Sequence, residues 1–309
     1  MNLKQEISKI LLPNNKLIVL NYHQVSEYFD PQIHFRFTWT PLAVFEKHLS
    51  FLTNNYQILP LQEAIEKLKN QEIKNTVFSI TFDDGDQSLE QYVYPALVKR
   101  QIPATFFINT AYLEELKGNW FNIFRYLENS PLAEIYLTEE LWQKFITARK
   151  TMNSNEYDSI CSELEAFASK LPDDVHFYVN KEFLKNIDST LIHVGLHGHQ
   201  HQRFSMKTID WQRQDIQKNI DELKQYPTYV PIFSIPFGKP HDWTQETLKL
   251  AYSFGLTPVL SNSGYNVKYD QAIMQITCDD RSIEEMLENL SPFPKTYYEM
   301  NGLKWNNKQ

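Results

Sequence analysis

The sequence contains little cysteine, no run of basic residues and no long apolar segment. Its two cysteines, Cys161 and Cys278, lie far apart and outside any Cys-x-x-Cys pattern, so they predict neither a disulfide framework nor a cysteine metal site and fit a reducing compartment. Lysine and arginine number 30 against 38 aspartates and glutamates, which gives a net charge of −8. Without clustered positive charge, we do not expect a nucleic acid as partner.

Membrane and export signals are also missing. No segment approaches the ~18 to 20 apolar residues that a membrane-spanning helix needs. The first 23 residues carry charges inside their apolar stretches and contain no small-residue cleavage site, so we expect no signal peptide. The sequence therefore predicts a cytoplasmic protein with no membrane span.

The 309 residues are 42% apolar and 22% charged, which is typical of a globular chain with a substantial core. Short apolar runs alternate with amphipathic segments, as in a parallel sheet or barrel covered by helices. The runs predict strands at Lys16–Tyr22, Thr76–Phe82, Ala104–Asn109, Leu191–Val194, Pro231–Ile235, Thr257–Leu260 and Ala272–Ile276, with a weaker one near Ile58. Seven or eight strands favour an α/β barrel, which we expect to form one domain over residues 1–309.

Helices are predicted between these strands. Apolar residues fall on one helical face in three segments: Leu42, Phe45, Leu49 and Leu52; Leu61, Ala64, Ile65 and Leu68; and Ile209, Ile216, Ile220 and Leu223. Capping-box spacing predicts helix starts at Ser88 with Gln91, Asp242 with Gln245 and Ser282 with Glu285.

Residues 112–190 interrupt the alternation. They contain no convincing strand and show helical patterns, for example over Leu137–Lys150 and Tyr157–Ser169. A connection between a strand and a helix normally needs only a few residues. We predict a helical insertion, either a lid or substrate wall at one rim of the barrel or an elaboration that serves packing alone.

Three polar clusters each follow a predicted strand. In the first, Thr81-Phe82-Asp83-Asp84-Gly85, two adjacent carboxylates at a buried strand end repel each other and lose hydration, so a cation or a bound proton is expected there. An ordinary helix-capping turn is the alternative for this cluster alone.

The second cluster, His197-Gly198-His199-Gln200-His201, holds three of the nine histidines. If the chain begins a helical turn here, His197 and His201 project from one face and can share a metal, while His199 points elsewhere. The third cluster, Ile235-Pro236-Phe237-Gly238-Lys239-Pro240, would alone be a turn. Because the loops at the carboxyl ends of barrel strands converge on one mouth, we expect all three clusters to meet.

Together Asp84, His197 and His201 make a ligand set that leaves positions on a Zn²⁺-like ion open for water and substrate. Such an ion lowers the pKa of bound water from about 15.7 towards 7 and polarises a carbonyl oxygen. Asp83, next to the ion but not bound to it, can accept the proton from that water. The pattern therefore predicts a hydrolase.

These motifs resemble the polysaccharide deacetylase family, also called the NodB-homology family or carbohydrate esterase family four. TFDDG, the His-x-x-x-His of His197 to His201 and the strand that ends in Pro-Phe-Gly carry the resemblance. The opening LNYHQV and the ATFFIN strand are similar to the branch of surface-polysaccharide deacetylases. The resemblance covers residues 17–276.

The resemblance implies a distorted (β/α)7–8 barrel and metal-dependent removal of acetyl groups from an N-acetylated carbohydrate. Asp83 would be the general base, and Asp84, His197 and His201 would bind a divalent ion, with Zn as the first expectation and Co, Ni or Mn as alternatives. The amide of Phe237, after Pro236, would donate to the oxyanion. Tyr22 and His23 match a Tyr-His pair of that branch and would line the mouth.

The chain also departs from the family pattern. Ser234 stands where many members carry an arginine, and no histidine follows His241, so the family's late Leu-x-x-His and its general acid have no counterpart. His23, His199, His241 or a water are the alternatives for the acid. A catalytically impaired, metal-containing carbohydrate-binding protein is the second hypothesis for the function.

Overall fold

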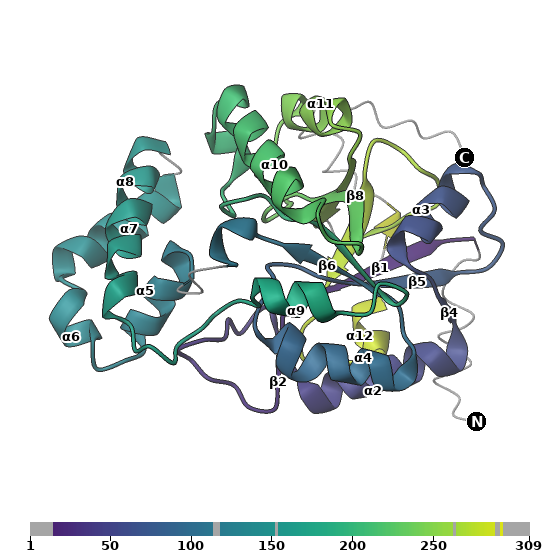
Figure 1. Ribbon diagram of the computed structural model, residues 1–309, viewed down its shortest axis with the longest axis horizontal. Helices are drawn as coiled ribbons and strands as arrows, with labels where there is room; N and C mark the ends of the chain where they lie inside the picture. Colours follow the sequence, from purple (N-terminus) through teal and green to yellow (C-terminus); the bar gives the residue numbers. More distant parts are fainter. Residues whose placement is uncertain (1–14, 114–117, 152–153, 262–263, 288–290, 293–309) are drawn as a thin grey trace.

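Seven parallel strands close into a barrel in the computed structural model, which describes residues 15–113, 118–151, 154–261, 264–287 and 291–292 (Figure 1). Around the ring the strands are β1 (Leu17–Tyr22), β11 (Ile273–Thr277), β9 (Thr257–Ser261), β8 (Tyr229–Ser234), β7 (Ile192–Leu196), β6 (Ala104–Ile108) and β5 (Val77–Phe82). Pairing of β5 with β1 closes the ring. The predicted barrel is therefore confirmed.

The barrel is distorted at β5. The short strand β4 (Gln57–Ile58) pairs with the start of β5 at Val77 and Phe78, while β6 pairs with the end of β5 at Thr81 and Phe82. β4 and β6 therefore share one side of β5 by pairing with different parts of it. The weak strand predicted near Ile58 is therefore present, but it lies outside the closed ring of seven strands.

Alternation along the strands sorts the side chains into two layers. Ile18, Leu20 and Tyr22 of β1 belong to the large cluster that packs against the helices. Leu17 and Val19 belong to a second cluster, which also takes in residues of β5, β6, β8, β9 and β11. The interior is therefore apolar at the amino-terminal end of the strands.

Helices cover the outside of the barrel, and in most places they coincide with the segments for which an apolar helical face was predicted. The flanking helices are α2 (Leu42–Asn55), α3 (Leu61–Lys69), α4 (Tyr94–Arg100), α10 (Ile209–Leu223), α11 (Gln245–Ser253) and α12 (Ile283–Leu287), with a π-helical turn η1 (Leu89–Val93) before α4. All four predicted face residues of α3 are buried and join the inner cluster, so α3 covers the amino-terminal end of the barrel.

The predicted face of α10 is partly wrong. Ile209 is 40% exposed, and the buried stripe consists of Gln212, Asp215, Ile216, Asn219 and Leu223. Polar residues occupy this stripe because it packs against backbone groups of the site described below.

Of the three predicted helix starts, only Ser282 with Glu285 forms the capping box, with reciprocal hydrogen bonds of 2.9 and 3.3 Å. Helix α11 is capped instead by Thr244 with Thr247. The Ser88 hydroxyl accepts from the Val25 amide, a bond from another part of the chain, and so does not cap its own helix.

The segment between β6 and β7 contains the helices α5 (Trp120–Glu128), α6 (Ala133–Tyr136), α7 (Glu139–Thr151), α8 (Ser154–Glu165) and α9 (Lys181–Asn186), and none of its described residues belongs to a strand of the barrel. Figure 1 shows α5 to α8 grouped beside the barrel. Two clusters of buried side chains, separate from those of the barrel, pack these helices together.

Small strand pairs that the sequence did not predict lie outside the ring: β2 (Gln24–Ser26) with β3 (Trp39–Pro41), and β10 (Gly264–Tyr265) with β12 (Ser291–Pro292). They are too short for alternation to reveal them. Among the described residues, no helix combines the length and apolarity required to cross a bilayer. The expectation about a signal peptide concerns the first 23 residues, of which 1–14 lie outside the described residues.

A candidate metal site at the mouth of the barrel

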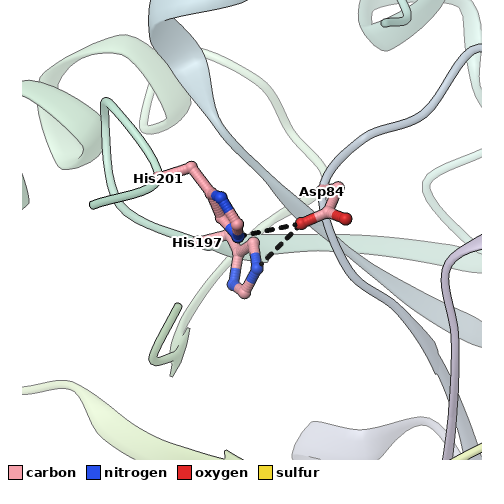
Figure 2. Close-up of side chains that lie close together, drawn as sticks. All are labelled: Asp84, His197 and His201. Carbon is pink, nitrogen blue, oxygen red and sulfur yellow. Dashed lines mark ion pairs between the residues drawn. The ribbon is translucent and has the colours of Figure 1, made fainter. Parts of the chain in front are cut away.

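The three polar clusters follow β5, β7 and β8, which are parallel strands, so all three lie at the carboxyl end of the barrel. The structure brings Asp84, His197 and His201 together, with one potential ligand atom from each residue within 4.8 Å of the others. The Nε2 atoms of His197 and His201 both lie 3.2 Å from Oδ1 of Asp84. Figure 2 shows both imidazoles turned towards this oxygen.

The orientation of His197 is set from behind. Its Nδ1 lies 2.7 Å from the carbonyl oxygen of Ser234, so Nδ1 carries the proton and Nε2 faces Asp84. A backbone carbonyl on the far nitrogen is the usual device that orients a metal-binding histidine. Burial alone would lower the pKa of His197, but Asp83 and Asp84 raise it to about 8.

Asp84 is electrostatically suited to cations. Burial would raise its pKa, but the charge on His201 and the hydrogen bonds with both imidazoles outweigh this effect and hold the pKa well below its usual range. Asp84 is also one of few non-glycine residues with left-handed backbone, at φ 74°. Such strain is typical of functional positions.

The histidine loop is not the helical turn that the spacing suggested. After β7 the backbone is left-handed at Gly198 (φ 75°) and at His201 (φ 49°). These two residues turn the chain so that the imidazole of His201 lies next to that of His197. A Cβ at Gly198 would lie 3.0 Å from Oδ1 of Asp215, so glycine is required here for space as well as conformation. His199 points away, with Nδ1 2.9 Å from the hydroxyl of Thr110.

Side chains from two neighbouring elements hold this loop. The Asp215 carboxylate on α10 accepts from the amides of His199 (2.7 Å) and Gln200 (3.0 Å). The Asn219 side chain accepts from the amide of His197 (3.1 Å), and Asn109 at the end of β6 donates to the carbonyl of Gly198 (3.1 Å). These contacts fix the backbone of the loop from His197 to Gln200.

Asp83 lies beneath Asp84 and is 2% exposed. Its Oδ2 accepts from the side-chain amides of Asn21 (2.8 Å) and Gln275 (3.0 Å). Its Oδ1 is buried and has no hydrogen-bond partner among the described residues. One oxygen is therefore held, and the other can interact with a ligand.

The third loop reaches the same place through Phe237. Its ring centroid lies 4.8 Å from that of His201, and its backbone is left-handed at φ 61°. The guanidinium of Arg203 lies 5.1 Å from the centroid of the Phe237 ring, and Arg203 Nε lies 3.1 Å from the buried carboxylate of Asp242. Pro236 is buried before it.

Tyr22 and His23 have different environments. Tyr22 is fully buried, with its hydroxyl 3.0 Å from Nδ1 of His48, so it packs behind the site and does not line the mouth. Its position on the outward face of β1 explains this difference from the expectation. His23 is partly exposed, its charge lowers the pKa of Asp84, and its buried Nδ1 has no partner among the described residues.

The residues present fit a divalent ion. Two imidazole nitrogens and one carboxylate oxygen face each other, and the buried Oδ1 of the neighbouring Asp83 has no hydrogen-bond partner among the described residues. Nitrogen and oxygen donors in this number are typical of a catalytic zinc site with open positions. Without a cation, this arrangement would leave acidic groups poorly compensated.

Five residues that support the site were not identified from the sequence: Asn21, Asn109, Asp215, Asn219 and Gln275. The only signal for two of them is the four-residue spacing of Asp215 and Asn219 around Ile216, which places polar groups on an apolar helix face. The others are single amides within strands, at Asn21 and Gln275, or directly after one, at Asn109. Nothing in the local sequence distinguishes them from surface residues.

Comparison with known proteins places these features in context. A family model described as polysaccharide deacetylase matches residues 69–259. A poly-β-1,6-N-acetyl-D-glucosamine N-deacetylase of Staphylococcus aureus is 27% identical over 191 residues, which are 58% of this chain and 64% of the relative. The chain thus matches slightly less than two thirds of that relative's length.

Solved structures show the same fold. The Streptococcus pyogenes deacetylase PplD, in complex with acetate, matches with a TM-score of 0.62 and 16% identity, covering 91% of this chain and 100% of the other. IcaB from Ammonifex degensii matches with a TM-score of 0.59 and 17% identity, covering 85% and 92%.

Proposed function

Since this chain belongs to the polysaccharide deacetylase family, we propose that it is a metal-dependent hydrolase that removes acetyl groups from an N-acetylated carbohydrate. The observation that carries the proposal is the meeting of Asp84, His197 and His201 beside a second buried carboxylate, Asp83. A metal site alone would suit a structural role. An unliganded carboxylate oxygen next to it provides the base that hydrolysis requires.

We assign one role to each residue. Asp84, His197 and His201 hold the ion, which we propose to be zinc, with cobalt, nickel or manganese as alternatives. A bound divalent ion would acidify water and polarise the amide carbonyl. Asp83 takes a proton from the attacking water at Oδ1, and the Phe237 amide donates to the carbonyl oxygen as negative charge develops there.

The departing amine needs a proton, and we assign this step to His23. It follows β1 at the same end of the barrel, lies close enough to lower the pKa of Asp84, and is partly exposed. The two alternative histidines are engaged elsewhere: His199 contacts Thr110, and the Nε2 of His241 lies 3.4 Å from Asp242.

A His23→Gln variant is expected to lose most activity on an N-acetyl sugar but little on an activated acetyl ester, whose leaving group needs no acid.

For the substrate we propose a polymer or oligomer of N-acetylglucosamine. The Staphylococcus aureus relative is named for poly-β-1,6-N-acetyl-D-glucosamine, and it supports this class without fixing the linkage. The net charge of −8 also favours a neutral polymer over an acidic one, because like charges repel.

The test is acetate release from β-1,6-linked N-acetylglucosamine oligomers by the zinc-loaded protein. Asp83→Asn should abolish all but a residual release while the zinc content stays near one per chain, whereas Asp210→Asn on the exposed surface of α10 should change neither. Full activity in Asp83→Asn would remove Asp83 as the base. Oligomer binding without any acetate release would support a catalytically impaired carbohydrate-binding protein instead.

A further inference from the structure

Asp83 is held by two neutral side-chain amides from two neighbouring strands of the barrel. Asn21 lies on β1 and Gln275 on β11, and both donate to the same oxygen, Oδ2, over 2.8 and 3.0 Å. All three side chains are at most 2% exposed. Hydrogen bonds to a charged group in such a site are stronger and more directional than those in water.

The hydroxyl of Thr81 lies within hydrogen-bond distance of the oxygen of each amide and can donate to one of them at a time. The hydroxyl of Thr81 lies 3.1 Å from Oδ1 of Asn21 and 3.2 Å from Oε1 of Gln275. The Gln275 nitrogen also reaches the hydroxyl of Ser234 at 3.2 Å. If either amide turned over, its oxygen would face the Asp83 carboxylate at close range, so repulsion opposes the turned state.

This arrangement makes the two oxygens of Asp83 different. Oδ2 receives two donors, whereas the buried Oδ1 has none among the described residues. Two donors on one oxygen oppose rotation of the carboxylate. They also oppose movement of Oδ2 towards the neighbouring cation site, where Asp83 would become a further ligand.

We propose that Asn21 and Gln275 are positioning residues for the general base: they keep Oδ2 of Asp83 away from the metal and leave Oδ1 free for the proton of the attacking water. This inference rests on the proposed function for its catalytic part. Its geometric part, that the amide pair keeps Asp83 off the ion, holds independently of turnover.

The catalytic part is tested with Gln275→Met, which keeps the volume and removes the donor. We expect kcat for acetate release from N-acetylglucosamine oligomers to fall about tenfold to a hundredfold, as for the loss of a buried hydrogen bond to a charged group. KM and zinc content should stay unchanged. Gln275→Asn, which retains an amide that is too short to reach Asp83, should show the same loss and serves if the methionine variant does not fold.

Asn266→Ala is the matched control. This buried amide also joins β1 and β11, through the carbonyls of Leu17 (3.1 Å) and Met274 (2.9 Å), but it does so at the opposite end of β1. It should lower the melting temperature without changing kcat of the folded enzyme. An equal fall in kcat for Asn266→Ala would assign the effect of Gln275→Met to the barrel in general.

A double-mutant cycle separates positioning from a general structural role. In an Asp83→Asn background, Gln275→Met should cause no further loss of the residual acetate release, because the residue through which it acts is already disabled. The same fold-loss in both backgrounds would overturn the proposal.

Crystal structures of the zinc-loaded wild type and the Asn21→Leu/Gln275→Met variant test the geometric part. We expect Oδ2 of Asp83 to stay on the amides in the wild type and to turn to the zinc in the variant. An unmoved Asp83 in the variant would overturn the inference even if the enzyme is active. A wild type that releases no acetate would refute the proposed function while these structures still decide the geometry.

Discussion

Two histidines four residues apart reach one carboxylate oxygen here through loop backbone. Each Nε2 lies 3.2 Å from Oδ1 of Asp84, although left-handed residues Gly198 and His201 interrupt the segment. The residue types were sufficient to predict that these three side chains form a candidate metal site, because imidazole and carboxylate are groups that bind zinc. The helical turn proposed for them was wrong because local spacing takes no account of the buried carboxylate of Asp215, which holds the loop.

His201 provides the most direct test of the ligand set. We expect His201→Ala to lose most of its zinc, because the remaining two donors are too few for a stable site. Zinc content of the purified protein, measured by mass spectrometry, checks this, with His241→Ala as a control at a histidine outside the set. Stoichiometric zinc in His201→Ala would show that the ion binds elsewhere.

Zinc affinity should depend on pH through His197. With the metal absent, its pKa of about 8 means that it is protonated at pH 7, and the proton must leave before Nε2 can bind zinc. Affinity should therefore rise about fivefold from pH 7 to pH 8 and level off at higher pH.

Competition with a chelator at several pH values measures this dependence, and calorimetry in buffers of different ionisation enthalpy counts the released protons. An affinity that is constant between pH 7 and 8 would contradict the assignment.

The same pKa shift of His197 stabilises the metal-free fold. Because the folded pKa lies above the unfolded value of about 6.5, this stability is present below pH 6.5 and is lost as the pH rises through 8.

At the scale of elements, α10 does more than cover the barrel. Its buried stripe combines apolar residues with Asp215 and Asn219, which bind the backbone of the histidine loop. Burial raises the pKa of Asp215 to about 6, although the hydrogen bonds that it accepts from two backbone amides lower the pKa. The helix therefore buries the carboxylate of Asp215 at a cost in free energy. The hydrogen bonds that Asp215 accepts from the histidine loop account for its presence there.

Replacing Asp215 should therefore weaken the site without touching a ligand. In Asp215→Ala the buried amides of His199 and Gln200 lose their acceptors, and we expect zinc affinity to fall about tenfold to a hundredfold, as is typical when an outer-shell partner is lost. Gln214→Ala, exposed on the same helix, should leave the affinity unchanged. Equal affinities for Asp215→Ala and wild type, measured by chelator competition, would contradict this role.

The elements themselves were largely predictable. Every predicted strand is present, since parallel strands buried on both faces are short apolar runs that stand out from amphipathic helices. Ile209 was wrongly placed on a buried face because periodicity records apolar residues and misses polar ones with buried partners. Gln275 could not be found at all, because its partner Asp83 is 192 positions away in the chain.

At the scale of the whole molecule, the segment between β6 and β7, which carries the helices α5 to α9, contacts both the site and the barrel through residues outside these helices. The amide of Gln87 donates to the carbonyl of Phe177 (3.0 Å), and that of Val179 donates to Gly85 (2.9 Å), directly after the paired aspartates. The hydroxyl of Tyr112 donates to the carbonyl of Gln200 in the histidine loop (3.1 Å). We propose that these helices form an insertion that supports the metal loops within a single domain.

A single domain should unfold in one step. Although α5 to α8 have their own buried clusters, Phe35 stacks on Phe121 with centroids 4.6 Å apart, and Arg125 donates to the carbonyl of His34 (3.2 Å), so loss of the insertion would also expose the loop between β2 and β3. Calorimetry of the zinc-loaded chain should give one transition with equal calorimetric and van't Hoff enthalpies. Removal of zinc with a chelator should lower its midpoint, because the ion binds only the folded state. Two transitions, with only one that responds to zinc, would mean that the helices fold independently and that their contacts with Gly85 and Gln200 do not couple them to the metal site.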